Sequence, residues 1–261
     1  MEIRAFFEEY DRLSDTADDA TLEKLLTDTC TAYRGENPSD SLGQSALYNE
    51  LGSFYRARGV YGRGEEAFLA AKKILEHSDC TAQASGTSKA GCVGCGPLID
   101  YANAPENGAA CAAKDLTETC DYATTLNNLA GLYRLWGNYS KALELFGAAA
   151  ERYAKLENLP ADVHASCHNN MGLVYLHLKQ GQAAEACFGR ALGILEGAEE
   201  RDYARGTTLS NLAFALLLSE KKEDAAGALK TAAQCFLSAS GSEDELYQNC
   251  IAMLKKLERP L

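Results

Sequence analysis

The sequence lacks an excess of positive charge, with 25 Lys and Arg against 37 Asp and Glu in 261 residues and a formal net charge of −12. Proteins bind nucleic acids and anionic membrane surfaces through surplus Lys and Arg, so we expect neither as a partner. Long apolar runs are also absent, since no stretch reaches the roughly 18 apolar residues that a membrane-spanning helix needs. The first residues, MEIRAFFEEYDRL, contain no apolar signal-peptide segment. We therefore expect a cytoplasmic protein.

Cysteine, in contrast, is abundant, with ten residues. In a cytoplasmic chain these should be reduced thiols rather than a disulfide framework. Six are expected to lie in or beside helices as small hydrophobic residues: Cys30, Cys120, Cys167, Cys187, Cys235 and Cys250. The other four, Cys80, Cys92, Cys95 and Cys111, fall in one Gly-, Ala- and Ser-rich stretch. Cys92-Val-Gly-Cys95 has the spacing of a zinc knuckle or redox pair, but the other two thiols complete neither site, so we expect no metal and no cofactor.

Four segments of the chain repeat one pattern of small and large apolar residues. They begin at Ala46 (ALYNELGSFYRARGVYGRGEEAFLAA), Thr124 (TTLNNLAGLYRLWGNYSKALELFGAA), Ser166 (SCHNNMGLVYLHLKQGQAAEACFGRA) and Thr207 (TTLSNLAFALLLSEKKEDAAGALKTA). Each has a small register residue, which is Gly52, Ala130, Gly172 or Ala213. Further small residues follow at 12 and 19 positions, and at 16 positions comes Phe68, Phe146, Phe188 or Leu229. Such spacing predicts two helices that approach closely, with the large side chain filling the space between them.

This pattern resembles the tetratricopeptide repeat family, in which Leu-Gly, Tyr, Ala and Phe recur at these intervals. The period of 42 residues from Ala130 to Gly172 exceeds the roughly 34 typical of the family, and together with the strings LNNLA and LSNLA it resembles repeats of the kinesin-light-chain type. The usual early Trp is replaced by Tyr48, Leu126, His168 and Leu209, and the closing Pro is absent or displaced. The resemblance implies an all-α, right-handed α-solenoid of helix pairs.

We expect the chain to divide into seven parts. Helical spacing over Glu2–Leu13 and Asp18–Arg34, with Asp18 as a helix cap, and over Glu243–Leu257 predicts capping helices that cover the open ends of the solenoid. The predicted parts are N-terminal capping helices 1–36, repeat one 37–77, a Gly/Ala/Ser/Cys-rich loop insertion 78–118, repeat two 119–159, repeat three 160–201, repeat four 202–240 and a C-terminal capping helix 241–261.

Motifs of catalysis are missing from the sequence. There is no G-x-S-x-G, Walker or G-x-G-x-x-G string, and the four histidines have no metal-triad spacing. His168 stands at a core position of the repeat, where we expect a hydrogen-bonded packing residue rather than a ligand. We therefore predict a protein that is not an enzyme.

Binding is expected on one side of the first helix of each pair, which lines the groove in the resembled family. Helix geometry places four positions on the side of the helix opposite the residues that pack within the pair. These positions are three before the register residue and one, four and five after it. An Asn column there could hold the backbone of an extended peptide, and Arg56 and Arg134 would favour an acidic residue in it. The predicted peptide- or partner-binding residues are Asn49, Arg56, Asn127, Asn128, Arg134, Asn169, Asn170, His177 and Asn211. The sequence does not identify the partner or the oligomeric state.

The fourth repeat has an apolar groove side formed by Phe214, Leu217 and Leu218. We expect the C-terminal helix to cover these side chains, and an oligomer contact is the alternative. The predicted function is thus a non-catalytic scaffold that binds a peptide or protein partner. Two alternatives stay open: a self-associating structural protein with an occluded groove, and a zinc- or redox-responsive adaptor that uses the cysteines of the insertion.

Overall fold

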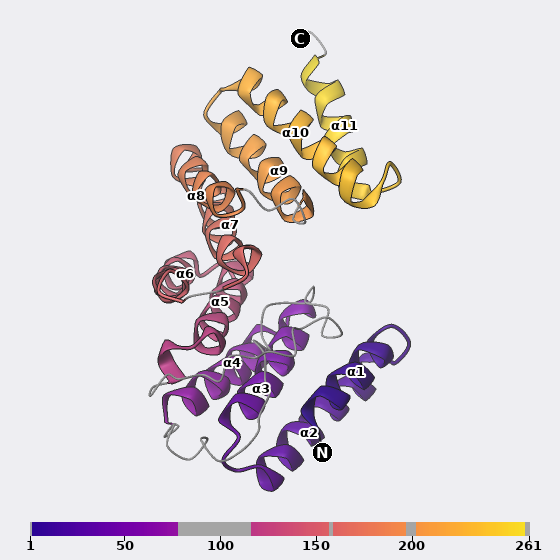
Figure 1. Ribbon diagram of the computed structural model, residues 1–261, viewed down its shortest axis with the longest axis vertical. Coiled ribbons are helices and arrows are strands. Elements are labelled where there is room, and N and C mark those ends of the chain that lie inside the picture. Colours follow the sequence, from indigo (N-terminus) through magenta and orange to yellow (C-terminus); the bar gives the residue numbers. More distant parts are fainter. Residues whose placement is uncertain (1, 78–115, 157–158, 197–201, 259–261) are drawn as a thin grey trace. The chain divides into compact units, whose positions relative to one another are not determined.

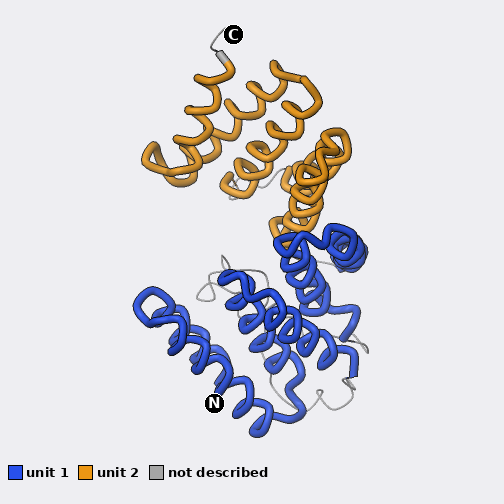
Figure 2. Tube along the Cα trace, turned by 180° about the vertical axis from the view of Figure 1, so that it is seen from behind, with its two compact units in different colours: residues 1–156 blue, residues 157–261 orange. Residues whose placement is uncertain are grey.

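The computed structural model describes residues 2–77, 116–156, 159–196 and 202–258 (Figure 1). Every regular element in these ranges is a helix, which confirms the predicted all-α class. The chain forms two compact units, residues 1–156 and 157–261 (Figure 2). Of the helices described, none is both long and apolar enough to cross a membrane. Apart from residues 116–118, the predicted insertion 78–118 lies outside the described residues, and Leu116–Glu118 is one turn of 3-10 helix rather than loop.

The first unit contains two helix pairs that follow two N-terminal helices. Its helices are α1 (Ile3–Ser14), α2 (Asp19–Glu36), α3 (Ser41–Ala57), α4 (Tyr61–Glu76), η3 (Leu116–Glu118), α5 (Cys120–Leu135) and α6 (Tyr139–Tyr153). Helix α3 packs on α4, α4 on α5, and α5 on α6. Phe6, Phe7 and Tyr10 of α1 join one buried cluster with side chains of α2 and α3. The N-terminal helices thereby cover the apolar side of the first pair, as a solenoid cap must.

The second unit contains the other two pairs and a final helix. Its helices are α7 (Ala161–His177), α8 (Gly181–Ile194), α9 (Asp202–Leu218), α10 (Lys222–Ser240) and α11 (Glu245–Glu258). They pack in chain order, each on the next. Helix α11 contributes the buried Cys250 and Leu254 to the cluster around Phe236. It therefore closes the apolar side of the last pair.

Polar side chains fix where several helices begin. Asp18 accepts a hydrogen bond from the backbone N of Thr21 at 2.8 Å, as the sequence predicted, and Asp40 accepts one from Gly43 at 2.9 Å. Asn138 does the same for Lys141 at 3.3 Å. Each bond satisfies one of the backbone N–H groups that the first turn of a helix leaves without a partner.

The small register residue is where the two helices of a pair approach most closely. A Cβ atom added at Gly52 would lie 2.7 Å from the Phe68 ring, and one at Gly172 would lie 2.5 Å from the Phe188 ring. Phe68 and Phe188 are both fully buried. Glycine is thus required at these two positions because any larger residue would displace the aromatic ring.

The turns between paired helices share one backbone conformation. The residue seven after the register position has a positive φ in all four pairs: 72° at Gly59, 84° at Gly137, 56° at Lys179 and 60° at Glu220. Glycine adopts this conformation without steric cost, whereas Lys and Glu do so with some strain. The second unit therefore has less favourable turns than the first.

The predicted cover over the fourth repeat is only partly present. Leu217 packs against the cluster that α11 completes. Phe214 and Leu218 remain 44% and 48% exposed, so the prediction that the C-terminal helix covers all three side chains is wrong. The physical reason is geometric: Phe214 and Leu218 are four residues apart and share a stripe of α9. Helix α11 packs mainly on α10, so it does not reach that stripe.

Candidate functional site

The candidate site is the side of each first helix that carries the positions three before and four after the register residue. We call this side the binding face. In the first unit it presents Asn49 and Arg56 on α3, and Asn127 and Arg134 on α5. In the second unit it presents Asn169 and Leu176 on α7, and Ser210 and Leu217 on α9. The first unit is therefore basic at this face and the second largely apolar.

Arg56 and Arg134 are half-buried and lie near one another on adjacent first helices. Burial lowers the pKa of both guanidinium groups, and the positive charge of Arg134 lowers that of Arg56 further. Arg134 Nε is buried and has no hydrogen-bond partner in the described part of the chain. In the same ranges, neither arginine lies within ion-pair distance of a carboxylate. Two neighbouring, desolvated guanidinium groups that form no ion pair in the described ranges make a site that an anion would stabilise.

Gly131 leaves the space in which the Arg56 side chain lies. A Cβ atom at this position of α5 would be 3.2 Å from Arg56 Nη1. Gly131 stands one residue after the register position, where the sequence gives no reason for glycine beyond its small size. The sequence places Gly131 on the binding side of α5, and the structure adds that it leaves room for Arg56, so we assign it as a residue that positions Arg56.

One carboxylate, that of Glu50, lies near enough to Arg56 for each group to shift the pKa of the other. Burial and the neighbouring Asp11 carboxylate raise the pKa of Glu50 to about 7, although Arg56 acts in the opposite direction. Burial also raises the pKa of Asp11 on α1. Glu50 occupies the position, two before the register residue, where the other repeats have Asn, and we did not select it from the sequence. A group with a pKa near 7 is partly protonated at neutral pH, so Glu50 only partly offsets the positive charge of Arg56.

Two of the predicted binding asparagines are buried between helices. Asn49 is 5% exposed, and its Nδ2 donates to Thr125 Oγ1 at 2.8 Å and to the Ser45 carbonyl oxygen at 3.1 Å. Asn128 is 6% exposed. These positions join neighbouring helices within the first unit, so we assign them to packing. The Oδ1 atoms of Asn49 and Asn127 both have no hydrogen-bond partner among the described residues. Asn127, however, is half-buried and so remains accessible.

The asparagines of the second unit form part of the predicted column. Asn211 Nδ2 donates to Asn169 Oδ1 at 3.1 Å, which joins α9 to α7 at the binding face. Both residues and Asn170 are half-buried, and His177 is exposed at the end of α7. In this bond the single side-chain oxygen of Asn169 is the acceptor. Leu173, Leu176 and the exposed Phe214 give the rest of this face its apolar character.

The histidines and thiols of the described ranges give no second site. His168 lies beside His164 with ring centroids 5.6 Å apart, and burial lowers the pKa of both rings. We expected the ring of His168 to be hydrogen-bonded. The prediction is wrong for Nδ1, which is buried and has no hydrogen-bond partner in the described part of the chain. No group of three or more metal-ligating side chains occurs in the ranges described.

Five of the six helical cysteines are buried free thiols: Cys30, Cys167, Cys187, Cys235 and Cys250. Burial raises the pKa of Cys30 to about 12, which keeps that thiol protonated and unreactive. Cys120 is disulfide-bonded, contrary to the prediction that all ten thiols are reduced. Cys80, Cys92, Cys95 and Cys111 lie outside the described residues, so the zinc or redox alternative stays a prediction.

Comparison with known proteins agrees with the fold. The sequence profile described as tetratricopeptide repeat matches residues 123–162, which include α5 and α6. No curated protein matches the chain in sequence.

Solved structures of the same architecture cover nearly the whole chain. The crystal structure of BtubC (BKLC) from P. vanneervenii has a TM-score of 0.67 at 19% identity, over 93% of this chain and 84% of that one. A Podosopora anserina structure described by its nearly identical TPR-like repeats of a kinesin light chain has a TM-score of 0.60 at 16% identity, over 92% and 97% of the two chains. Pseudomonas aeruginosa pilF has a TM-score of 0.50 at 13% identity, over 98% and 92%. At these identities the likeness concerns the fold, and it confirms the predicted resemblance to tetratricopeptide and kinesin-light-chain-type repeats.

Proposed function

Since the chain is a solenoid of tetratricopeptide repeats, we propose that it is a non-catalytic scaffold that binds an extended segment of a partner protein on its binding face. Tetratricopeptide repeats in general mediate protein–protein interaction, and the identity of this chain's partner is open. The observation that carries the proposal is the pair of half-buried arginines, Arg56 and Arg134, neither of which forms an ion pair in the described part of the chain. We expect the scaffold to act in the cytoplasm.

The chemistry of the face suggests the chemistry of the partner segment. An Asp or Glu side chain placed between Arg56 and Arg134 would accept charge-assisted hydrogen bonds from the guanidinium groups. It would also replace the water that Arg134 Nε loses on burial. Asn127 and the Asn169–Asn211 pair can form hydrogen bonds with the backbone of a peptide, whatever its side chains are. The apolar face of the second unit, with Leu176 and Phe214, suits an aliphatic or aromatic side chain. An acidic residue therefore suits the binding face of the first unit, and a large apolar residue suits that of the second unit.

The test begins with a random peptide library displayed on phage and selected on the intact chain. We expect the selected peptides to be enriched in Asp or Glu, and Arg56→Gln and Arg134→Gln each to weaken a selected peptide about ten-fold or more, because a hydrogen bond to a charged group contributes about 1.5–3 kcal/mol. Isothermal titration calorimetry measures the change. Arg12→Gln is the matched control, since Arg12 is an exposed arginine that pairs with Glu9 on α1. Selected peptides without carboxylates, or equal affinities of all three variants, would contradict the proposal.

Self-association is the second candidate, and one observation favours it. Phe214 and Leu218 are 44% and 48% exposed on the same stripe of α9. Large apolar side chains exposed together are typical of interaction surfaces. In this alternative a second copy, rather than a partner peptide, covers the binding face of the second unit.

A further inference from the structure

The two arginines of the binding face meet over one glycine of α5. Asn127, Gly131 and Arg134 follow one another at spacings of four and three residues, so they lie along one stripe of this helix. Arg56 reaches the stripe from α3, because its Nη1 atom lies 3.2 Å from the place where a Cβ atom of Gly131 would be. Its guanidinium carbon lies 5.9 Å from the centroid of the buried Phe68 ring. The head group of Arg56 therefore lies over the middle of the stripe.

Unused hydrogen-bonding atoms of both kinds lie on this stripe. Arg134 Nε, a donor, and Asn127 Oδ1, an acceptor, are buried and have no hydrogen-bond partner in the described part of the chain. Neither arginine forms an ion pair in the same ranges. The positive charge of Arg134 lowers the pKa of Arg56, because two like charges so close repel each other. A ligand that matches the stripe therefore brings negative charge to the arginines and an N–H group to Asn127.

The positive charge at this place exceeds what one carboxylate can neutralise. Arg56 and Arg134 are both cations, and Glu50, the carboxyl group that acts on Arg56, has a pKa of about 7 and is only partly ionised at neutral pH. An Asp or Glu side chain of a ligand brings a single negative charge shared by its two oxygens. A phosphate monoester brings about 1.5 to 2 negative charges and three acceptor oxygens, so it can bind both guanidinium groups at once.

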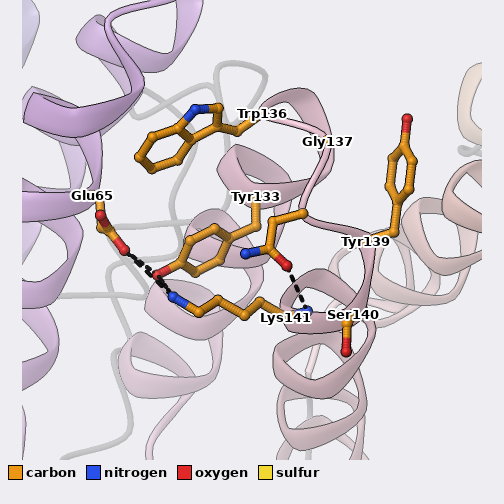
Figure 3. A pocket seen from close by; sticks show the side chains of 8 residues that line it. Glu65, Tyr133, Trp136, Gly137, Tyr139, Ser140 and Lys141 are labelled. Atoms are coloured by element: carbon orange, nitrogen blue, oxygen red, sulfur yellow. Dashed lines mark hydrogen bonds and ion pairs between the residues drawn. The ribbon is translucent and has the colours of Figure 1, made fainter.

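A pocket at the turn between α5 and α6 has the opposite arrangement of charge. Glu65 of α4, Tyr133 of α5 and Lys141 of α6 lie on its wall (Figure 3). Lys141 Nζ lies 3.9 Å from Glu65 Oε1 and donates to the Tyr133 hydroxyl oxygen at 3.3 Å, and this hydroxyl donates to Glu65. A phosphate bound here would have to displace the Glu65 carboxylate, whereas Arg56 and Arg134 form no ion pair in the described ranges that would have to break.

We propose that Arg56 and Arg134 bind the phosphate of a phosphorylated Ser or Thr in the partner segment, so that phosphorylation of the partner strengthens the complex. This inference rests on the proposed function, because it names the acidic group that the binding face takes. Phosphoserine and phosphothreonine have short side chains, so the backbone of the segment stays close to α5 when the phosphate lies over Gly131. One of its N–H groups can then donate to Asn127 Oδ1, one turn before Gly131.

The test captures peptides on the intact chain from three degenerate libraries, whose central residue is phosphoserine, Glu or Ser. The best phosphoserine peptide is then made again with Glu and with Ser at that position, and isothermal titration calorimetry gives the three dissociation constants. We expect phosphoserine to bind about ten-fold more tightly than Glu, and Glu more tightly than Ser, because each step adds charge and acceptor oxygens for the two arginines.

The possible results separate this inference from the proposed function. Equal affinities for the phosphoserine and Glu peptides, both tighter than Ser, would overturn the phosphate inference and still support an acidic partner segment. Capture from the Glu library alone would have the same meaning. Capture from none of the libraries, or equal affinities for all three versions of the peptide, would contradict both.

Two variants show whether the arginines are responsible for the preference. Arg134→Gln should reduce the preference for phosphoserine over Glu from about ten-fold to about three-fold or less, since one guanidinium group remains. Lys141→Gln is the matched control and should keep the full preference, because Lys141 is a cation of the same unit that pairs with Glu65. Equal loss in both variants, or inorganic phosphate that displaces the peptide at equal concentration, would overturn the proposal. Circular dichroism melting of both variants verifies that they are folded.

Discussion

Replacing Phe188 with alanine is expected to lower the free energy of unfolding of the second unit by about 3–5 kcal/mol. The Phe188 ring is fully buried, and it fills the space over Gly172, where even a Cβ atom would lie 2.5 Å from the ring. Removing the ring leaves a cavity at the closest approach of α7 and α8. Neither Gly172 nor the backbone can move in to fill it, because both helices also pack on their neighbours.

Phe214→Ala is the matched control for this substitution. It removes the same atoms from α9 in the same unit, but Phe214 is 44% exposed, so the loss should stay within about 1 kcal/mol. Urea unfolding of the intact chain, followed by circular dichroism, measures both. Equal losses in the two variants would show that the register residue and the aromatic ring do not form the packing contact that defines each pair.

Deleting residues 245–261 should destabilise the second unit by at least about 4 kcal/mol and cause aggregation. Helix α11 buries Cys250 and Leu254, and Leu246, Ile251 and Leu257 of the same helix pack on the cluster that they join. Without it, the apolar side of α9 and α10 would face water, as happens when a solenoid loses its terminal cap. The estimate counts about 1.5–3 kcal/mol for each large apolar side chain that loses its buried environment.

Two point variants keep this prediction testable if the truncated chain cannot be purified. Leu254→Ala should lower the free energy of unfolding by about 2–3 kcal/mol, because Leu254 is 8% exposed. Lys255→Ala changes the next residue, which is exposed, and should have an effect within about 0.5 kcal/mol. A truncated chain that stays monomeric and melts at the same temperature as the full chain would contradict the role of α11 as a cap.

The repeat register could be predicted from the sequence because it depends on side-chain volume at fixed spacing. Gly52 and Gly172 lie against aromatic rings 16 residues later, and the small residues at the register and later positions are buried. The positive φ seven residues after the register position could be inferred only where glycine marks it, at Gly59 and Gly137. Lys179 and Glu220 share the conformation, but neither residue type indicates it.

The side-chain surroundings of the binding face could be predicted less well. Helical periodicity predicts that Arg56 and Arg134 share one face, but it does not predict that they form no ion pair in the described ranges, which depends on how neighbouring helices pack. Asn49 belongs to the same position as Asn127, yet Thr125 of the next first helix binds it and makes it a packing residue. The exposure of Phe214 could not be predicted, because the packing of α11 mainly on α10 cannot be read from periodicity alone.

The central claim is that a partner segment lies on the binding face, and NMR mapping with an acidic peptide from the library selection tests it most directly. Addition of the peptide to the labelled, intact chain should move the backbone signals of Asn127 and Gly131 on α5 and the side-chain Nε–H signal of Arg134. Signals of α6, such as Phe146, which is fully buried beneath α5, should not move. Shifts confined to α4 and α6, or a binding face already protected by a second copy before the peptide is added, would contradict the account.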